Sequence, residues 1–160
     1  MRVLAIGCHP DDIEIACAGT LAKCVKRGDK VIVCHTSSGD LGHVVIPPEE
    51  LRVIRANEAK KAGSLAGIEV IYGGFDDLNI YEYSKEARDK MVDVIRYANP
   101  DFIITHNPDD YMPDHTSVSK LYVDELSFLH RYNFLWGYNF LWGYMLQSTL
   151  TTPFENQLNV

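Results

Sequence analysis

The sequence has no apolar run near the roughly 20 residues that a transmembrane helix needs, so we expect no membrane span. It has fewer basic than acidic residues, 15 against 22, and its formal charge of −7 argues against nucleic acid or an anionic membrane as the main partner. No GxGxxG pattern follows the first apolar segment, which disfavours a dinucleotide-binding protein. The N-terminal segment lacks the pattern of a signal peptide, so we expect a cytoplasmic protein.

The sequence also has no Cys-x-x-Cys pair. Its four cysteines stand in apolar, periodic segments, a context typical of buried free thiols in a reducing compartment. They are Cys8, Cys17, Cys24 and Cys34. With 160 residues and 46% hydrophobic content, the chain is long enough to bury a core without disulfides, and we predict a single domain over 1–160.

Short apolar runs alternate along the chain with amphipathic segments. The apolar runs predict buried strands over 2–8, 30–36, 68–72 and 101–105. The amphipathic segments predict helices over 13–27, 49–66, 85–98 and 115–129, with Gly28 ending the first and Ser84 capping the third. This alternation predicts an α/β fold, a Rossmann-like three-layer α/β/α arrangement around a mostly parallel sheet. Ligands of such sheets bind outside the carboxyl ends of the strands.

The C-terminal segment carries a short exact repeat, NFLWGY at 133–138 and again at 139–144. Every even position from 134 to 144 is aromatic, and a period of two places all six side chains on one face of a strand. One interpretation is a strand or hairpin that covers the core. The alternative is a surface through which the chain forms a homo-oligomer.

Two polar clusters follow predicted strands. His9, Asp11 and Asp12 follow the first, and the segment 106–115, which contains two histidines and three aspartates, follows the fourth. The aspartates of the first cluster could instead cap a helix, and the second cluster could be a solvated loop. A helix cap does not account for His9, however. Two histidines and one carboxylate drawn from both clusters make the ligand number of a catalytic zinc site, and the same set can hold Fe²⁺.

Three segments together resemble the LmbE-like, or PIG-L, deacetylase family. CHPDDIEIACAGTLAK (8–23) resembles its opening motif, and RVIRANEAKKAGSLAGI (52–68) resembles its Arg-x-x-Glu helix. ITHNPDDYMPDHTSVSKL (104–121) resembles its second metal motif. The resemblance implies a zinc-dependent hydrolase that removes the acetyl group from an N-acetylglucosamine-type sugar or sugar conjugate. Zn²⁺ is the expected cofactor, with Fe²⁺ or another divalent metal as alternatives.

The resemblance also implies roles for single residues. The metal ligands would be His9, Asp12 and His115, and Asp11 would be the general base. Asp114 would be catalytic by orienting His115 or a neighbouring group.

Three further residues are expected to bind the substrate. Arg55 matches a family arginine near the substrate, although it could equally be a solvated helix charge. Asp77 follows the third predicted strand, where either it or Asp76 could bind substrate or form a turn. His106 directly follows the fourth predicted strand, at the same edge of the sheet.

The sequence departs from the family pattern in two places. Met112 stands where the family usually has a histidine that helps to protonate the amine, and methionine cannot donate a proton. His106, Asp114 or Tyr111 would have to serve instead, or turnover is impaired. The second departure is the aromatic repeat: from about residue 130 it replaces the usual C-terminal region, so we expect a divergent or truncated tail.

Two other functions therefore stay open. The chain could be an amidase that acts on a small thiol–sugar conjugate. It could also be a catalytically impaired remnant of the family that binds metal or forms oligomers.

Overall fold

The alternation of apolar and amphipathic segments produces the alternating strands and helices of the structure, a computed structural model. It describes the backbone of residues 1–129 and 135–138 and the side chains of residues 1–122. Each predicted strand and helix is present. In chain order the elements are β1 (Arg2–Gly7), α1 (Asp12–Arg27), β2 (Lys30–Ser37), α2 (Pro48–Ala66), β3 (Glu69–Phe75), α3 (Lys85–Ala98), β4 (Phe102–His106), α4 (Pro113–Leu129) and β5 (Leu135–Tyr138).

The strands form one sheet in the order β3-β2-β1-β4-β5, and each neighbouring pair is parallel. The chain builds outward from β1 to β3 and then crosses back to place β4 on the other side of β1. The strand order therefore reverses between β1 and β4, and the carboxyl ends of these two strands flank the crevice where such sheets bind ligands. The predicted Rossmann-like α/β fold is confirmed.

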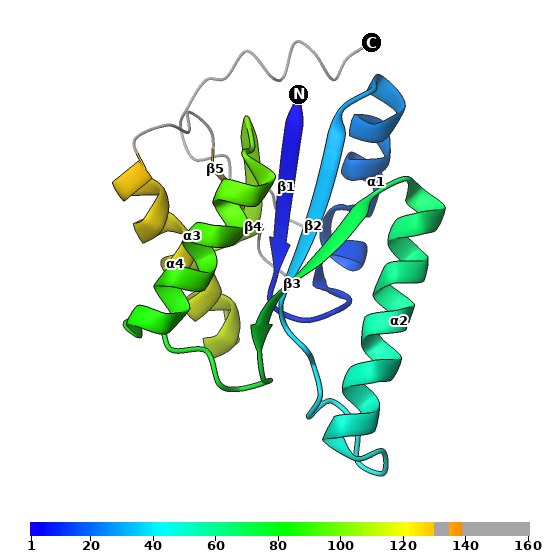
Figure 1. Ribbon diagram of the computed structural model, residues 1–160, viewed down its shortest axis with the longest axis vertical. Helices are drawn as coiled ribbons and strands as arrows, with labels where there is room; N and C mark the ends of the chain where they lie inside the picture. Colours follow the sequence, from blue (N-terminus) through cyan, green and yellow to red (C-terminus); the bar gives the residue numbers. More distant parts are fainter. Residues whose placement is uncertain (130–134, 139–160) are drawn as a thin grey trace.

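Two helices cover each face of the sheet (Figure 1). Helices α3 and α4 pack on one face against side chains that include Leu4 and Ile6 of β1. Helix α1 packs on the opposite face against Val3 and Ala5, with α2 beside it against β3. The alternation of these β1 side chains shows that the central strand is buried on both faces, as expected from its unbroken apolar sequence.

The predicted helix ends are also confirmed. The Ser84 hydroxyl accepts a hydrogen bond from the backbone N–H of Ala87 and caps α3. Gly28 has a φ of 93° after α1, a conformation that glycine adopts without steric cost.

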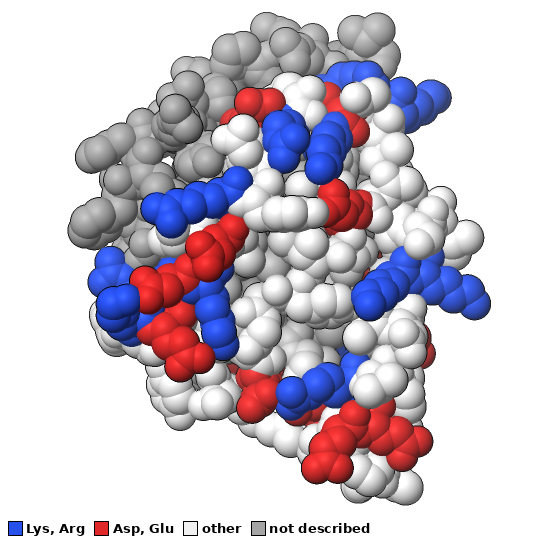
Figure 2. Space-filling view, in the orientation of Figure 1, with Lys and Arg blue, Asp and Glu red and all other residues white. Residues whose placement is uncertain are grey.

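The aromatic segment contributes β5, which pairs with β4 and confirms a strand over 135–138. The remaining positions of the aromatic pattern, and the predicted oligomer contact through them, lie outside the described residues. All four cysteines are free, as predicted. Among the helices within 1–129, none combines the length and apolar composition required to cross a bilayer. Basic and acidic side chains are interspersed over the described part of the face drawn in Figure 2.

A pair of helical glycines tests the packing of α2 on the sheet. A Cβ at Gly63 would approach the carbonyl oxygen of Ile68 to 2.8 Å and overlap Val70, whereas a Cβ at Gly19 of α1 meets nothing within 4 Å. We expect Gly63→Ala to lower the free energy of unfolding by about 1–3 kcal/mol through overpacking. Gly19→Ala should raise it by about 0.5–1 kcal/mol through helix propensity. Urea unfolding followed by circular dichroism measures both changes, and a stabilising Gly63→Ala would contradict this packing.

Candidate metal centre

Four polar residues meet at the crevice between β1 and β4. His9 follows the end of β1, and Asp12 is the first residue of α1. His106 is the last residue of β4, and His115 lies in the first turn of α4. The first two residues are about a hundred positions away from the other two in the sequence. The parallel pairing of β1 with β4 brings both pairs to the same edge of the sheet.

The three predicted metal ligands face one another. His9 Nδ1 lies 3.5 Å from Asp12 Oδ2, and His115 Nε2 lies 3.5 Å from Asp12 Oδ1. The two imidazole nitrogens, His9 Nδ1 and His115 Nε2, are 3.3 Å apart. A tetrahedral zinc ion with bonds of 2.0–2.2 Å separates its ligand atoms by about 3.3–3.6 Å. The two contacts with Asp12 involve different carboxylate oxygens, and one ligand atom from each of the three side chains lies within 4.8 Å of the others. The group is therefore compact enough to surround a zinc ion or a divalent metal of similar size.

The helix-cap alternative for the first cluster is wrong. Asp11 stands at the N-cap position of α1, but its side chain makes no capping hydrogen bond. The Asp12 carboxylate instead accepts the backbone N–H of His9 at 2.7 Å, which turns its oxygens toward the histidines. The solvated-loop alternative is also wrong for Asp114, His115 and His106, because all three are buried.

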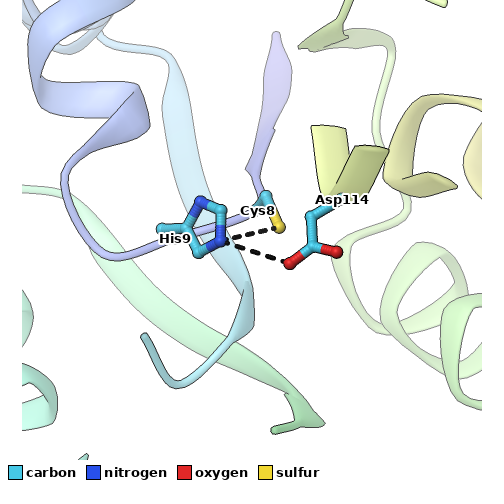
Figure 3. A group of neighbouring side chains, drawn as sticks. All are labelled: Cys8, His9 and Asp114. Atoms are coloured by element: carbon cyan, nitrogen blue, oxygen red, sulfur yellow. Dashed lines mark hydrogen bonds and ion pairs between the residues drawn. The ribbon is translucent and has the colours of Figure 1, made fainter. Parts of the chain in front are cut away.

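A second group of acidic side chains lies on the other side of the His9 ring. Cys8 Sγ and Asp114 Oδ2 each lie 3.5 Å from His9 Nε2, and Figure 3 shows both beside this ring. Asp77 Oδ1 is closer, at 3.0 Å. With Nε2–H directed at these carboxylates, Nδ1 keeps its lone pair for a metal ion. The surroundings of Cys8 oppose ionisation, since burial raises the pKa of its thiol to about 11.

The electrostatics of the cluster favour a positive charge at its centre. Burial works to lower the pKa of the His9 imidazole, but the neighbouring carboxylates of Asp114, Asp12 and Asp77 raise it far above its usual range. Burial also works to raise the pKa of Asp12, yet the surrounding histidines lower it well below its usual range. A proton on His9 satisfies these carboxylates in the absence of a cation, and a divalent ion bound at Nδ1 would satisfy them as well.

The partner of His115 is Asp110, which was not among the predicted site residues. Its Oδ1 lies 3.2 Å from His115 Nδ1, so it completes a carboxylate–histidine–metal arrangement with Nε2 facing the ligands. Asp114 was predicted to orient His115 or a neighbouring group, and of these two partners the structure places it against the neighbouring His9. Consecutive residues of a helix point in different directions, and Asp114 turns toward His9 instead. The only sequence feature that pointed to Asp110 was its position within the polar cluster 106–115.

His106, predicted to bind substrate, is fully buried behind the metal ligands. Its Nε2 accepts the backbone N–H of Cys8 at 2.8 Å and lies 3.2 Å from Asp12 Oδ2. Its ring stacks on that of His115 with centroids 3.9 Å apart. Burial lowers the pKa of His106, which favours the neutral ring that can accept this hydrogen bond. The structure thus places His106 where its ring supports His115 and where its Nε2 fixes the backbone at Cys8.

Asp11 and Arg55, predicted as general base and substrate contact, form an ion pair. Arg55 Nη2 lies 3.1 Å from Asp11 Oδ2, and its Nη1 donates to the carbonyl oxygen of Gly39. Gly39 has a φ of 61°, and a Cβ there would collide with the guanidinium, so this loop requires glycine. The Asp11 side chain remains 51% exposed, so it is accessible from solvent.

Comparisons with known proteins identify relatives of this chain. The family model described as PIG-L, GlcNAc-PI de-N-acetylase, matches residues 4–125. A diacetylchitobiose deacetylase from Thermococcus kodakarensis is 30% identical over 135 residues, which cover 79% of this chain and 49% of that protein. A mycothiol S-conjugate amidase from Streptomyces coelicolor is 27% identical, covering 76% of this chain and 50% of that protein.

A solved structure of similar fold supports the same grouping. The N,N'-diacetylchitobiose deacetylase from Pyrococcus horikoshii superposes with a TM-score of 0.73 at 27% identity, over 79% of this chain and 49% of that one. The chain spans about half the length of the curated relatives that it matches.

Replacing His9 or His115 with alanine is expected to abolish metal binding, because each change leaves only two of the three ligands. Metal content after dialysis against Zn²⁺, measured by mass spectrometry, should fall from one ion per chain to near none. His43→Ala is the matched control, since His43 is exposed and its Nδ1 accepts the backbone N–H of Val45. An unchanged zinc content in both variants would show that these residues are not ligands.

Proposed function

The chain belongs to the PIG-L family, and from this premise we propose that it is a metal-dependent hydrolase that removes the acetyl group from an N-acetylated sugar or sugar conjugate. The observation that carries the proposal is the triad of His9, Asp12 and His115, in which the two imidazole nitrogens are 3.3 Å apart and each lies 3.5 Å from an oxygen of the Asp12 carboxylate. Zn²⁺ is the proposed metal, and the same donors accept Fe²⁺ or another divalent ion.

The names of the relatives correspond to this proposal and to its alternative. One is a diacetylchitobiose deacetylase, which supports an N-acetylglucosamine-type substrate. Another is a mycothiol S-conjugate amidase, which corresponds to hydrolysis of an amide on a thiol–sugar conjugate. The proposed unit is one deacetylase-like domain, and free cysteines support a cytoplasmic location.

The proposed mechanism assigns proton transfer to Asp11. When bound, a divalent metal would polarise the amide carbonyl and lower the pKa of the attacking water. Asp11 is the exposed carboxylate next to the ligand Asp12, and it would accept the proton of that water. The guanidinium of Arg55 fixes the Asp11 carboxylate at 3.1 Å and would also present a donor to a substrate hydroxyl.

The leaving amine also needs a proton. Met112 lacks one to give, and of the three residues named as substitutes, His106 and Asp114 are buried. Tyr111 is 52% exposed, and its ring meets that of His115 edge-on at a centroid distance of 6.0 Å. We therefore propose that Tyr111, or the proton taken up by Asp11, serves the amine.

Asp77, Asp114 and His106 have supporting roles in this proposal. Asp77 and Asp114 would act through His9 by accepting from its Nε2–H, since both are largely buried against that ring. His106 would support the site through its stacking on His115 and its hydrogen bond from the backbone N–H of Cys8.

The zinc-loaded protein is expected to release acetate from N-acetylglucosamine derivatives. Asp11→Asn should lower kcat by about 10²–10⁴-fold, because the amide no longer accepts a proton, while zinc content stays the same. Asp109→Asn, an exposed change in the loop after β4, is the control. Full activity of Asp11→Asn would exclude Asp11 as the base. Release of larger acyl groups in preference to acetate would favour the amidase alternative.

Met112→His separates an enzyme from a remnant. A histidine at this position adds a proton donor beside the centre, and we expect kcat to rise by about tenfold or more. The measurement is acetate release by both forms at equal zinc content. If neither form has activity while both bind zinc, the catalytically impaired remnant is the correct description and the hydrolase proposal fails.

A further inference from the structure

A buried carboxylate outside the ligand triad connects the loop after β2 with helix α2 and with the turn after β3. Asp40 lies in the loop after β2 and is 4% exposed. Its Oδ1 accepts the backbone N–H of Asp77 at 2.9 Å, and its Oδ2 accepts Arg52 Nη2 of helix α2 at 2.5 Å. Burial works to raise the pKa of Asp40, but these two donors and Ser38 hold it at about 2. Asp40 is therefore a fixed anion that faces the turn carrying Asp77.

Arg52 holds the same turn at a second point. Its Nη2 also lies 2.7 Å from Asp76 Oδ1, so one guanidinium bridges Asp40 and Asp76. The turn after β3 is thus fixed through its side chain at residue 76 and through its backbone at residue 77. The two anchors are Arg52 of α2, which contacts Asp76, and Asp40 of the loop after β2, which accepts the N–H of Asp77.

The turn needs such anchors because its backbone is strained. Leu78 has a φ of 56°, a left-handed conformation that is unfavourable for any residue with a bulky side chain. Its side chain is 65% exposed, so core packing does not hold it there. Two hydrogen bonds do: Asp77 N–H to Asp40, and Leu78 N–H to Asp114 Oδ2 at 3.1 Å.

We infer that Arg52 and Asp40 are positioning residues of the metal centre, which hold the turn so that Asp77 accepts from His9 Nε2. The inference rests on the proposed metal centre at His9 Nδ1. Because Asp77 fixes the proton of the ring on Nε2, Nδ1 keeps its lone pair directed at the metal. Arg52 acts on His9 only through Asp40, Asp76 and Asp77.

The experiment compares Arg52→Met with Arg27→Met. Arg27 also pairs with an aspartate, Asp29, but it stands in the last turn of α1, at the opposite edge of the sheet. Zinc affinity of the apo-protein, measured by competition with a chromogenic chelator, should fall about 10–100-fold in Arg52→Met and stay unchanged in Arg27→Met. Co²⁺ bound to Arg52→Met should show an altered visible absorption band, which a change confined to stability would not produce.

Asp40→Asn and Arg52→Lys extend the test. Asp40→Asn weakens both anchors and should reduce zinc affinity in the same way. If that variant does not fold, the half-exposed Arg52 carries the test alone. Arg52→Lys should recover only part of the affinity, because the ammonium keeps the charge but ends a shorter side chain than the one that places Nη2 against both carboxylates. Acetate release should show a lower kcat at limiting zinc, with KM little changed.

Two outcomes are decisive. Zinc affinity of Arg52→Met equal to that of Arg27→Met would overturn the inference. Weakened zinc binding in Arg52→Met, together with a wild-type protein that releases no acetate, would support the inference while the proposed deacetylase function fails.

Discussion

The structure depends on how buried negative charge is compensated around one imidazole. Asp12 faces His9 on one side, and Asp77 and Asp114 face it on the other. Each carboxylate comes from a different part of the chain, and none could be buried so deeply without a positive charge within hydrogen-bonding distance. A protonated ring or a divalent ion provides that charge, so the loops after β1, β3 and β4 are held together by a shared electrostatic requirement.

Much of this arrangement could be predicted from the sequence. Unbroken apolar runs predict strands that are buried on both faces. Because such strands alternate with amphipathic helices, they predict a parallel sheet with a layer of helices on each face. The polar residues directly after the strands then had to meet at one edge of the sheet. That reasoning predicts a meeting of one histidine and one carboxylate from the first cluster with one histidine from the second. The family resemblance then names His9, Asp12 and His115 as the three residues.

The finer assignments followed from features that periodicity does not encode. Asp110 and Asp114 are four positions apart, yet one serves His115 and the other His9, because the first lies in a loop and the second on a helix. Asp77 looked like a turn residue that could reach substrate, and its contact with His9 depends on a left-handed Leu78. Loop conformations of this kind are set by long-range hydrogen bonds, so neighbouring sequence does not reveal them.

The parallel pairing of β1 with β4 also has a consequence for the order of folding. It joins Val3 to Phe102, residues that a chain brings together slowly because a long loop must close first. His9 and His115 therefore become neighbours only once the sheet is assembled across its centre. An unfolded chain offers no comparable set of ligands, so a bound metal ion would stabilise the native state by mass action. Binding of the ion would thus require that the long-range contacts between β1 and β4 have already formed.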